Sequence, residues 1–233
     1  MSKKRDNKIK RQNVERMKSK FNFIKYDDYE LSSYDKHEIF MYGGIRKDSA
    51  TRKELETVKW IETMTPGDRL FDVGANIGAY SLIAAANGMK VYAFEPSATN
   101  FVVLLKNIIK NKFESDIIPL SVPLAEKSSL DYFNYYDLSA GASIHVFGEP
   151  IDYTGSEFKP VFRQLTMSST IDDLVFTYGV EGPTHLKIDV DGNELQILKG
   201  AKRVLATDDL QTICIEVMEK LADEAGITSL FVR

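Results

Sequence analysis

The feature that most constrains the fold is a short apolar segment that leads into a glycine-bearing turn and then into a run of small residues. Residues 69–73 predict a strand, residues 74–78 (Gly-Ala-Asn-Ile-Gly) predict a tight turn, and residues 80–87 predict a helix that Gly88 ends. Strands joined through helices pair in parallel by right-handed crossovers. We therefore expect an α/β fold in which this unit is the first strand–helix step.

The same alternation continues along the chain. A second strand is predicted at residues 90–94, and the helix after it carries apolar residues at helical spacing through residues 101–109. Further strands are predicted at 117–124, 185–190 and 211–217, with helices at 51–64 and 193–206, whereas residues 130–165 are poorly patterned. This order predicts a Rossmann-like, doubly wound, mostly parallel sheet with helices on both faces. Ligands of such sheets bind beyond the carboxyl ends of the strands.

The charge of the chain is unevenly distributed. Residues 1–20 hold nine Lys/Arg and two Asp/Glu, a local charge of +7, and the remaining residues carry a net charge of −11. Such a block can touch nucleic acid, an anionic lipid surface or an anionic glycan, although blocks of like charge usually stay solvated. We expect residues 1–20 to form a basic arm, residues 21–65 an extension with a helix, and residues 66–233 the ligand-binding domain.

The apolar segments are too short to suggest a membrane protein. No stretch approaches the roughly 18 consecutive apolar residues of a membrane span, and the lysines at the start do not suit a signal peptide. We therefore expect a cytoplasmic location. The single cysteine, Cys214, lies in an apolar run, which favours a buried small hydrophobe over a nucleophile.

Two clusters at predicted strand ends form a candidate nucleoside site. In the first, Gly74 and Gly78 let the backbone approach a ligand, and Asp72 can accept hydrogen bonds. Asn76 stands where the dinucleotide fingerprint has its middle glycine, so the turn instead resembles motif I of the S-adenosylmethionine methyltransferases. In the second, Glu95 precedes Pro96. A carboxylate about 20 residues after the glycine turn can bind both hydroxyls of a ribose.

At this point the chain is similar to the FkbM-type methyltransferase family over most of residues 66–217. The segments that carry the resemblance are FDVGANIGAYSLIAA (71–85), VYAFEPSATNFVVLLKNI (91–108), GASI (141–144), STIDDL (169–174) and HLKIDVDGNELQILKGA (185–201). The resemblance implies S-adenosylmethionine as methyl donor and O-methylation as the reaction. It implies hydroxyls of glycan sugars or of secondary metabolites as acceptors.

The resemblance also adds one site residue and shows two departures. In folds of this kind Glu126, just beyond the third predicted strand, is placed to meet the adenine amino group; the alternative is a solvated turn residue. Isoleucine at position 144 stands where the family often has a second serine. Family members commonly continue with a helix and a final antiparallel pair, whereas this sequence ends at Arg233, so we expect a shortened chain or a differently completed sheet.

Methyl transfer is an in-line displacement in which positioning is the main task, helped by a base that takes the hydroxyl proton. Asp189 and Asp191 are two apart on an extended segment, so their side chains share a face and are candidates for a general base, an acceptor clamp or metal ligands. The alternative is a strand-end carboxylate and a helix cap formed by Asp191 or Asn193. His145 is a further candidate base near neutral pH. Two carboxylates are too few to predict a metal.

The prediction is therefore an S-adenosylmethionine-dependent O-methyltransferase with a small-molecule or glycan acceptor. One alternative is a nucleic-acid methyltransferase that uses the basic arm, and it is disfavoured because the segment after 185–190 lacks the Asn/Asp-Pro-Pro-aromatic turn. Another is a non-catalytic domain that binds S-adenosylmethionine, and a nicotinamide dehydrogenase is the most remote. The oligomeric state stays open.

Overall fold

The computed structural model describes residues 39, 41–42 and 55–216. The predicted basic arm, most of the predicted extension and the last residues, 217–233, lie outside the described residues. Within the part that is described, no helix combines the length and the apolar character needed to cross a membrane.

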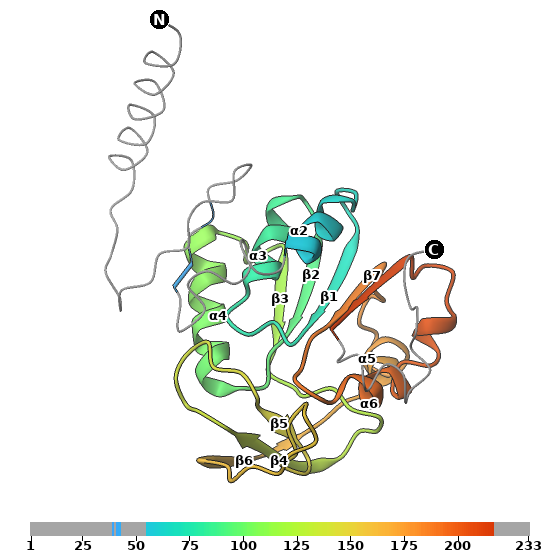
Figure 1. The fold of residues 1–233 in the computed structure, drawn as a ribbon. Coiled ribbons are helices and arrows are strands. Elements are labelled where there is room, and N and C mark those ends of the chain that lie inside the picture. The colour runs from blue at the N-terminus through green and yellow to red at the C-terminus, as the bar shows by residue number, and fades with distance from the viewer. Residues whose placement is uncertain (1–38, 40, 43–54, 217–233) are drawn as a thin grey trace, which may run out of the picture.

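A five-stranded parallel sheet forms the centre of the molecule (Figure 1). Its strands are β1 (Arg69–Val73), β2 (Lys90–Phe94), β3 (Ile117–Leu120), β7 (His185–Ile188) and β8 (Thr212–Ile215). The order is β3-β2-β1-β7-β8, and every neighbouring pair is parallel. The strand order therefore reverses between β1 and β7, which is where sheets of this kind bind ligands. The predicted parallel sheet is confirmed.

Helices cover both faces of this sheet, as predicted. On one face lie α2 (Leu55–Glu62), α3 (Ala79–Ala86) and α4 (Ala98–Asn111); on the other lie α5 (Ile171–Phe176), α6 (Glu194–Lys199) and the 3₁₀ turn η2 (Val204–Ala206). Alternate residues of each strand point to opposite faces of the sheet. Leu70 packs in the hydrophobic core under α2, α3 and α4, and Phe71 packs in the core under α5, α6 and η2. Burial on both faces explains why these strands are mostly apolar.

Some boundaries differ from the prediction for identifiable reasons. The strands predicted at 117–124 and 185–190 end at Leu120 and Ile188, because the residues after them leave the sheet to line a cavity. The helix predicted at 193–206 stops at Gly200, where an added Cβ would lie 2.1 Å from the carbonyl oxygen of Ala125. This close approach of the two backbones separates α6 from η2.

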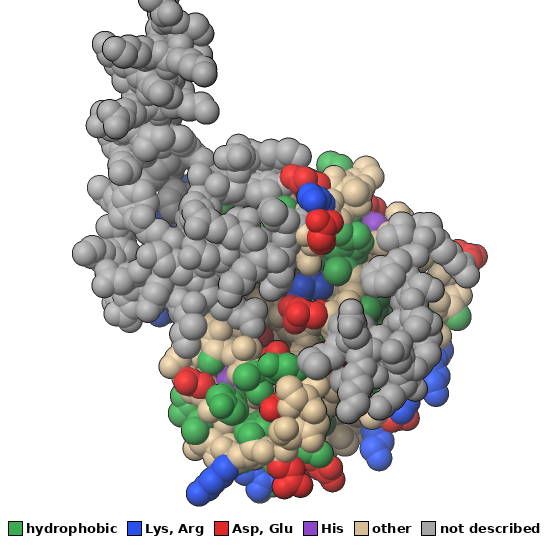
Figure 2. All heavy atoms as spheres, in the orientation of Figure 1, with side chains coloured by type: hydrophobic (Ala, Val, Ile, Leu, Met, Phe, Trp, Pro, Cys, Tyr) green, Lys and Arg blue, Asp and Glu red, His purple; other side chains and the backbone are tan. Residues whose placement is uncertain are grey.

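A second, antiparallel sheet was not predicted at all. It consists of β4 (Leu130–Tyr135), β5 (Val146–Phe147) and β6 (Phe162–Met167) in the order β5-β4-β6, and it lies at the bottom of Figure 1. Many of its apolar side chains are exposed, with Leu165 at 57% and Met167 at 58%, and Figure 2 shows hydrophobic side chains at the surface in this region. Without one consistently buried face, these strands lack the two-residue periodicity that predicts a strand.

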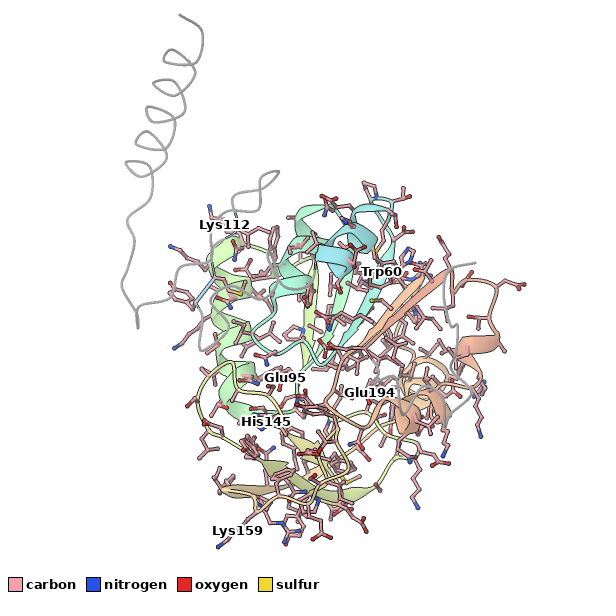
Figure 3. All side chains as sticks on the ribbon, in the orientation of Figure 1. Trp60, Glu95, Lys112, His145, Lys159 and Glu194 are labelled. Atoms are coloured by element: carbon pink, nitrogen blue, oxygen red, sulfur yellow. The ribbon has the colours of Figure 1, made fainter. Side chains whose placement is uncertain are left out.

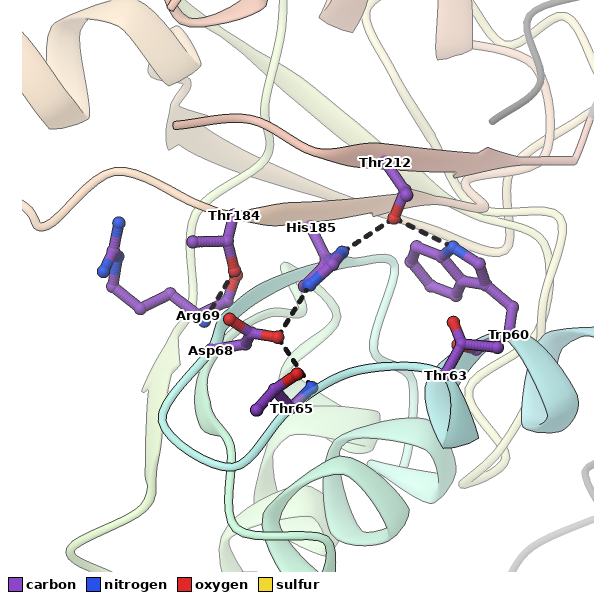
Figure 4. A network of polar contacts seen from close by, with 8 residues as sticks. All are labelled: Trp60, Thr63, Thr65, Asp68, Arg69, Thr184, His185 and Thr212. Carbon is purple, nitrogen blue, oxygen red and sulfur yellow. Dashed lines mark hydrogen bonds and ion pairs between the residues drawn. The ribbon is translucent and has the colours of Figure 1, made fainter. Parts of the chain in front are cut away.

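A chain of hydrogen bonds ties α2 to the amino end of the parallel sheet (Figure 4). The Trp60 indole, which can only donate, gives its hydrogen to Thr212 Oγ1 at 3.0 Å, so the hydroxyl hydrogen is free to go to His185 Nδ1 at 2.7 Å. His185 Nε2 then donates to Asp68 Oδ2 at 3.1 Å, and Asp68 Oδ2 also accepts from Thr65 N. With Nδ1 as acceptor and Nε2 as donor, the Trp60 N–H, the Thr212 hydroxyl and both ring nitrogens of His185 all have partners.

This network predicts a cost for removing one hydroxyl. Thr212→Val keeps the side-chain shape but leaves the Trp60 N–H and His185 Nδ1 without their partner, so we expect the free energy of unfolding to fall by roughly 1–3 kcal/mol. Chemical denaturation measures the change. The matched control is Thr63→Val, because the exposed Thr63 hydroxyl bonds only the carbonyl of Trp60 and water can replace it, for a change of about 0.5 kcal/mol or less. Equal stability of the two variants would contradict the prediction.

Candidate active site

A cavity lies between the carboxyl ends of the parallel strands and the small sheet. The space between its walls, open mouth included, is about 660 Å³. Figure 3 shows Glu95 and His145 near each other in this region, with Glu194 close by, whereas Trp60 lies at the opposite end of the sheet. The polar residues among those that line the cavity are Asn76, Glu95, Asn100, Ser143, His145, Asp189, Asp191 and Asn193.

The turn after β1 passes unusually close to the end of β7. Gly74 has a φ of 80°, and an added Cβ would lie 1.8 Å from the carbonyl oxygen of Asp189. The Asp189 N–H in turn donates to the Val73 carbonyl at 3.0 Å. Only glycine fits this position, both because of its left-handed backbone and because no space exists for a side chain. Gly74 lines the cavity.

Glu95 is held at the cavity wall by two backbone donors. Its carboxylate is 5% exposed and accepts from Asn76 N at 2.7 Å and from Ser97 N at 2.8 Å, one donor on each oxygen. Burial raises the pKa of Glu95 from 4.5 to about 7, against the lowering effect of these two hydrogen bonds and of a third from the Asn100 side chain. A carboxylate offers about four lone-pair sites, so capacity remains for a further donor. Pro96 lines the same wall.

A buried lysine that the sequence reasoning missed stands below the cavity. Lys187 is 3% exposed, and its Nζ lies 3.3 Å from Asp72 Oδ1 and 3.1 Å from Asp189 Oδ2. Burial opposes its charge, but the carboxylates of Asp189 and Asp72 outweigh burial and hold the pKa of Lys187 above its ordinary value. The signal in the sequence was a lone lysine within the apolar strand 185–188, in register with Asp72 on β1.

Asp72 supports the site without lining it. It is fully buried and accepts from Ser81 Oγ at 2.6 Å in addition to its ion pair with Lys187. Gly78, the residue before α3, also stays outside the cavity lining, and an added Cβ there would meet Leu104 of α4 at 2.5 Å. Asp72 and Gly78, two residues of the predicted first cluster, therefore support the turn from outside the cavity lining.

The side chains of the two predicted aspartates, Asp189 and Asp191, have different partners. Asp189 lies at the end of β7 beside Lys187, whereas Asp191 has a φ of 60° and its Oδ2 accepts from Ile144 N at 2.7 Å. The proposed helix cap is absent at Asn193, which precedes α6 but has no capping side-chain bond, and donates to the Phe147 carbonyl. Glu194 instead accepts from Gly192 N at 3.0 Å, and burial raises its pKa.

His145 is buried against the small sheet and lines the cavity. Its Nδ1 accepts from Tyr136 N at 3.3 Å, so the hydrogen of the neutral imidazole sits on Nε2. Burial lowers the pKa of His145 to about 4. In this tautomer Nε2 offers a hydrogen and not a lone pair, a geometry that does not fit the role of base for which the sequence suggested it.

Glu126 is a further predicted site residue that lies outside the cavity lining. Its side chain is exposed and does not belong to the cavity lining. This position agrees with the alternative of a solvated turn residue. Among the described residues, no group of three or more His, Cys, Asp or Glu is arranged to hold a metal ion. Burial raises the pKa of the Cys214 thiol, which agrees with an unreactive cysteine.

Comparison with known proteins identifies one family. The model of the Methyltransferase FkbM domain matches residues 72–231. The hexuronic acid methyltransferase AglP of Haloferax volcanii is 30% identical over 183 residues, which are 77% of this chain and 68% of that protein. The 31-O-demethyl-FK506 methyltransferase FkbM of Streptomyces tacrolimicus is 26% identical over 161 residues, 60% of this chain and 61% of that protein.

A solved structure is also similar. The methyltransferase FkbM from Methylobacillus flagellatus KT is 20% identical, with a TM-score of 0.47, and the match covers 70% of this chain and 37% of that chain. The match therefore spans a little over a third of the solved protein and about two thirds of each of the two relatives named above.

The contact at Gly74 generates a stability prediction. Gly74→Ala combines a left-handed backbone with a clash against β7, so we expect a loss of roughly 3–5 kcal/mol in the free energy of unfolding. Gly155→Ala is the matched control, because Gly155 has a φ of 81° and nothing within 4 Å of an added Cβ; its loss should be about 1–2 kcal/mol. Denaturant titration compares the two. Equal losses would show that the approach of β1 to β7 is looser than described.

Proposed function

Because this chain belongs to the FkbM methyltransferase family, we propose that it transfers the methyl group of S-adenosylmethionine to a hydroxyl of a sugar or other small molecule. The observation that carries the proposal is the cavity at the carboxyl edge of β1, β2 and β7, with Glu95 in its wall. The names of the two relatives support an oxygen acceptor, since one acts on a hexuronic acid and the other on a 31-O-demethyl compound.

The residues present fit this donor. Gly74 lines the cavity. The hydrogen-bonding capacity that remains on the Glu95 carboxylate can accept from a ribose hydroxyl. Asn76 lines the cavity, and its buried Oδ1 has no hydrogen-bond partner among the described residues, so it offers an acceptor to a donor group such as an amine. When bound, S-adenosylmethionine supplies an electrophilic methyl group on a sulfonium.

On the acceptor side, we assign Asp189 to bind the hydroxyl that is methylated. Its carboxylate lines the cavity, and the ion pair with the buried Lys187 fixes it from behind, so it can accept the hydroxyl hydrogen without reorientation. Lys187 is then a positioning residue, since it contacts Asp72 under the donor turn and Asp189 at once. Phe133 and Phe147 of the small sheet supply apolar surface to the same cavity.

The pKa of Glu95 predicts how donor binding depends on pH. Glu95 is ionised above pH 7 and protonated below it, and the ribose hydroxyls prefer the ionised form. The affinity for S-adenosylhomocysteine should therefore be constant above pH 7 and fall, by up to about tenfold per pH unit, as the pH drops below 7. Isothermal titration calorimetry between pH 5.5 and 8.5 measures it.

The variant Glu95→Gln should bind S-adenosylhomocysteine roughly 10- to 150-fold more weakly at pH 8, with no pH dependence. The matched control is Asp208→Asn, an exposed carboxylate outside the cavity lining, which should behave like the wild type. A flat pH profile in the wild type, or wild-type affinity in Glu95→Gln, would remove Glu95 from the donor site.

Turnover tests the reaction itself. Purified protein with methyl-labelled S-adenosylmethionine should transfer label to one or more members of a panel of neutral sugars, uronic acid sugars and polyhydroxylated small molecules, and not to RNA. Asp189→Asn should lower kcat by about 100- to 10,000-fold and change the affinity for S-adenosylhomocysteine by no more than about twofold. Label that enters RNA alone, or an Asp189→Asn variant with unchanged kcat, would defeat the proposal.

A further inference from the structure

A short segment crosses the cavity and is fastened on both sides; we name residues 141–147 the strap. On the side of the β1 turn, Gly141 N donates to Asn100 Oδ1 at 2.8 Å, and the Ala142 carbonyl accepts from Asn76 Nδ2 at 3.1 Å and Asn100 Nδ2 at 3.0 Å. These bonds place the strap beside Glu95, since Asn76 also donates its backbone N–H to that carboxylate.

On the side of β7, the strap is held at a strained point. Ile144 has a φ of 65°, a conformation that β-branched residues rarely adopt, and its N–H donates to Asp191 Oδ2 at 2.7 Å. Asn193 Nδ2 adds a bond to the Phe147 carbonyl at 3.1 Å. The charge-assisted bond from Ile144 to Asp191 offsets the strain and keeps the left-handed turn in place.

The residue that follows this turn is His145. It is 8% exposed, and its ring packs against Phe133 and Tyr135 at centroid distances of 6.0 and 5.2 Å. His145 lines the cavity. Its Nδ1 accepts from Tyr136 N, whereas its Nε2, which carries the hydrogen, is buried and has no hydrogen-bond partner among the described residues. A buried donor without a partner is unfavourable, so this position favours a ligand atom that accepts a hydrogen bond.

We propose that His145 donates its Nε2 hydrogen to a lone pair on the adenosyl part of the methyl donor, and that Asp191 aims His145 by holding Ile144 in its left-handed conformation. The proposal rests on the proposed function. Adenine ring nitrogens and the ribose ring oxygen are uncharged acceptors without hydrogens, which suits a neutral imidazole.

The adenosyl part is favoured because His145 lies on the same side of the cavity as Glu95. Tyr135, which packs on His145, accepts from Ala98 N, and the adjacent Ser97 N donates to Glu95. The strap is therefore attached to Asn76, and the Tyr135 ring that supports His145 is attached next to Ser97. Asn76 and Ser97 hold the Glu95 carboxylate, which we expect to bind the ribose. Asp191 and Ile144 act through His145 and are positioning residues.

The first experiment measures binding to two probes by calorimetry at pH 8. His145→Phe keeps an aromatic ring and loses the donor, so its affinities for S-adenosylhomocysteine and for 5′-methylthioadenosine should both fall about 5- to 20-fold. Equal losses on the two probes support a contact to the shared adenosyl part. No loss on either probe, or a loss confined to S-adenosylhomocysteine, overturns the proposal. Failure of the wild type to bind either probe overturns the proposed function, and this inference with it.

The second experiment tests the role of Asp191 with a double-mutant cycle on S-adenosylhomocysteine affinity. Asp191→Ala should weaken binding by a factor similar to that of His145→Phe. The double variant should bind only a little more weakly than either single variant, because both changes remove the same contact between His145 and the ligand. Additive losses overturn the positioning role.

A rescue variant separates aiming from folding. Asparagine adopts positive φ more readily than isoleucine, so Asp191→Ala with Ile144→Asn should regain most of the affinity that Asp191→Ala loses. A fold disrupted by Asp191→Ala would instead show a lowered melting temperature and would also lose the pH dependence of binding that belongs to Glu95. Absence of rescue in a variant that melts like the wild type overturns the role of the strained turn.

Discussion

The close approach of the β1 turn to the end of β7 is the constraint on which the rest of the site depends. Gly74 permits the approach because it has no side chain. The buried ammonium of Lys187 stabilises it, because the buried carboxylate of Asp72 and the partly buried carboxylate of Asp189 would otherwise lack a counter-charge between them. One cation therefore joins the strand that carries the donor turn to the strand that carries the candidate acceptor residue. Since both carboxylates contact the same Nζ, a shift of either strand disturbs both halves of the cavity.

Much of the architecture could be predicted from the sequence because it follows from local patterns. Strands buried on both faces are continuously apolar, and the glycine at position 74 marks a backbone that a ligand or another strand approaches. The position of Glu95 at the next strand end followed from the same logic, because parallel strands deliver their carboxyl ends to one edge. The expected cytoplasmic location and the basic arm stay predictions.

What the sequence did not reveal depends on contacts between distant segments. The role of Lys187 becomes clear only from its ion pair with Asp72. Asp72 lies 115 positions earlier in the sequence, and the register of β1 with β7 places the two residues side by side. The small sheet was missed because its exposed apolar side chains hide the alternation. Asp189 and Asp191 looked equivalent in the sequence, but a left-handed turn at Asp191 sends its carboxylate to the strap 47 positions earlier.

The charges around the cavity also differ between its lining and the residues below it. Its described lining includes the carboxylates of Glu95, Asp189 and Asp191 and no lysine or arginine, while the one buried ammonium below it is already paired. Such a cavity attracts a cationic ligand more strongly than an uncharged one. Under the proposed function the methyl donor carries a sulfonium charge that its product lacks, so the lining that favours binding of the donor also favours release of the product. The acidic wall and the neutral His145 are therefore compatible, because each recognises a different part of the same ligand.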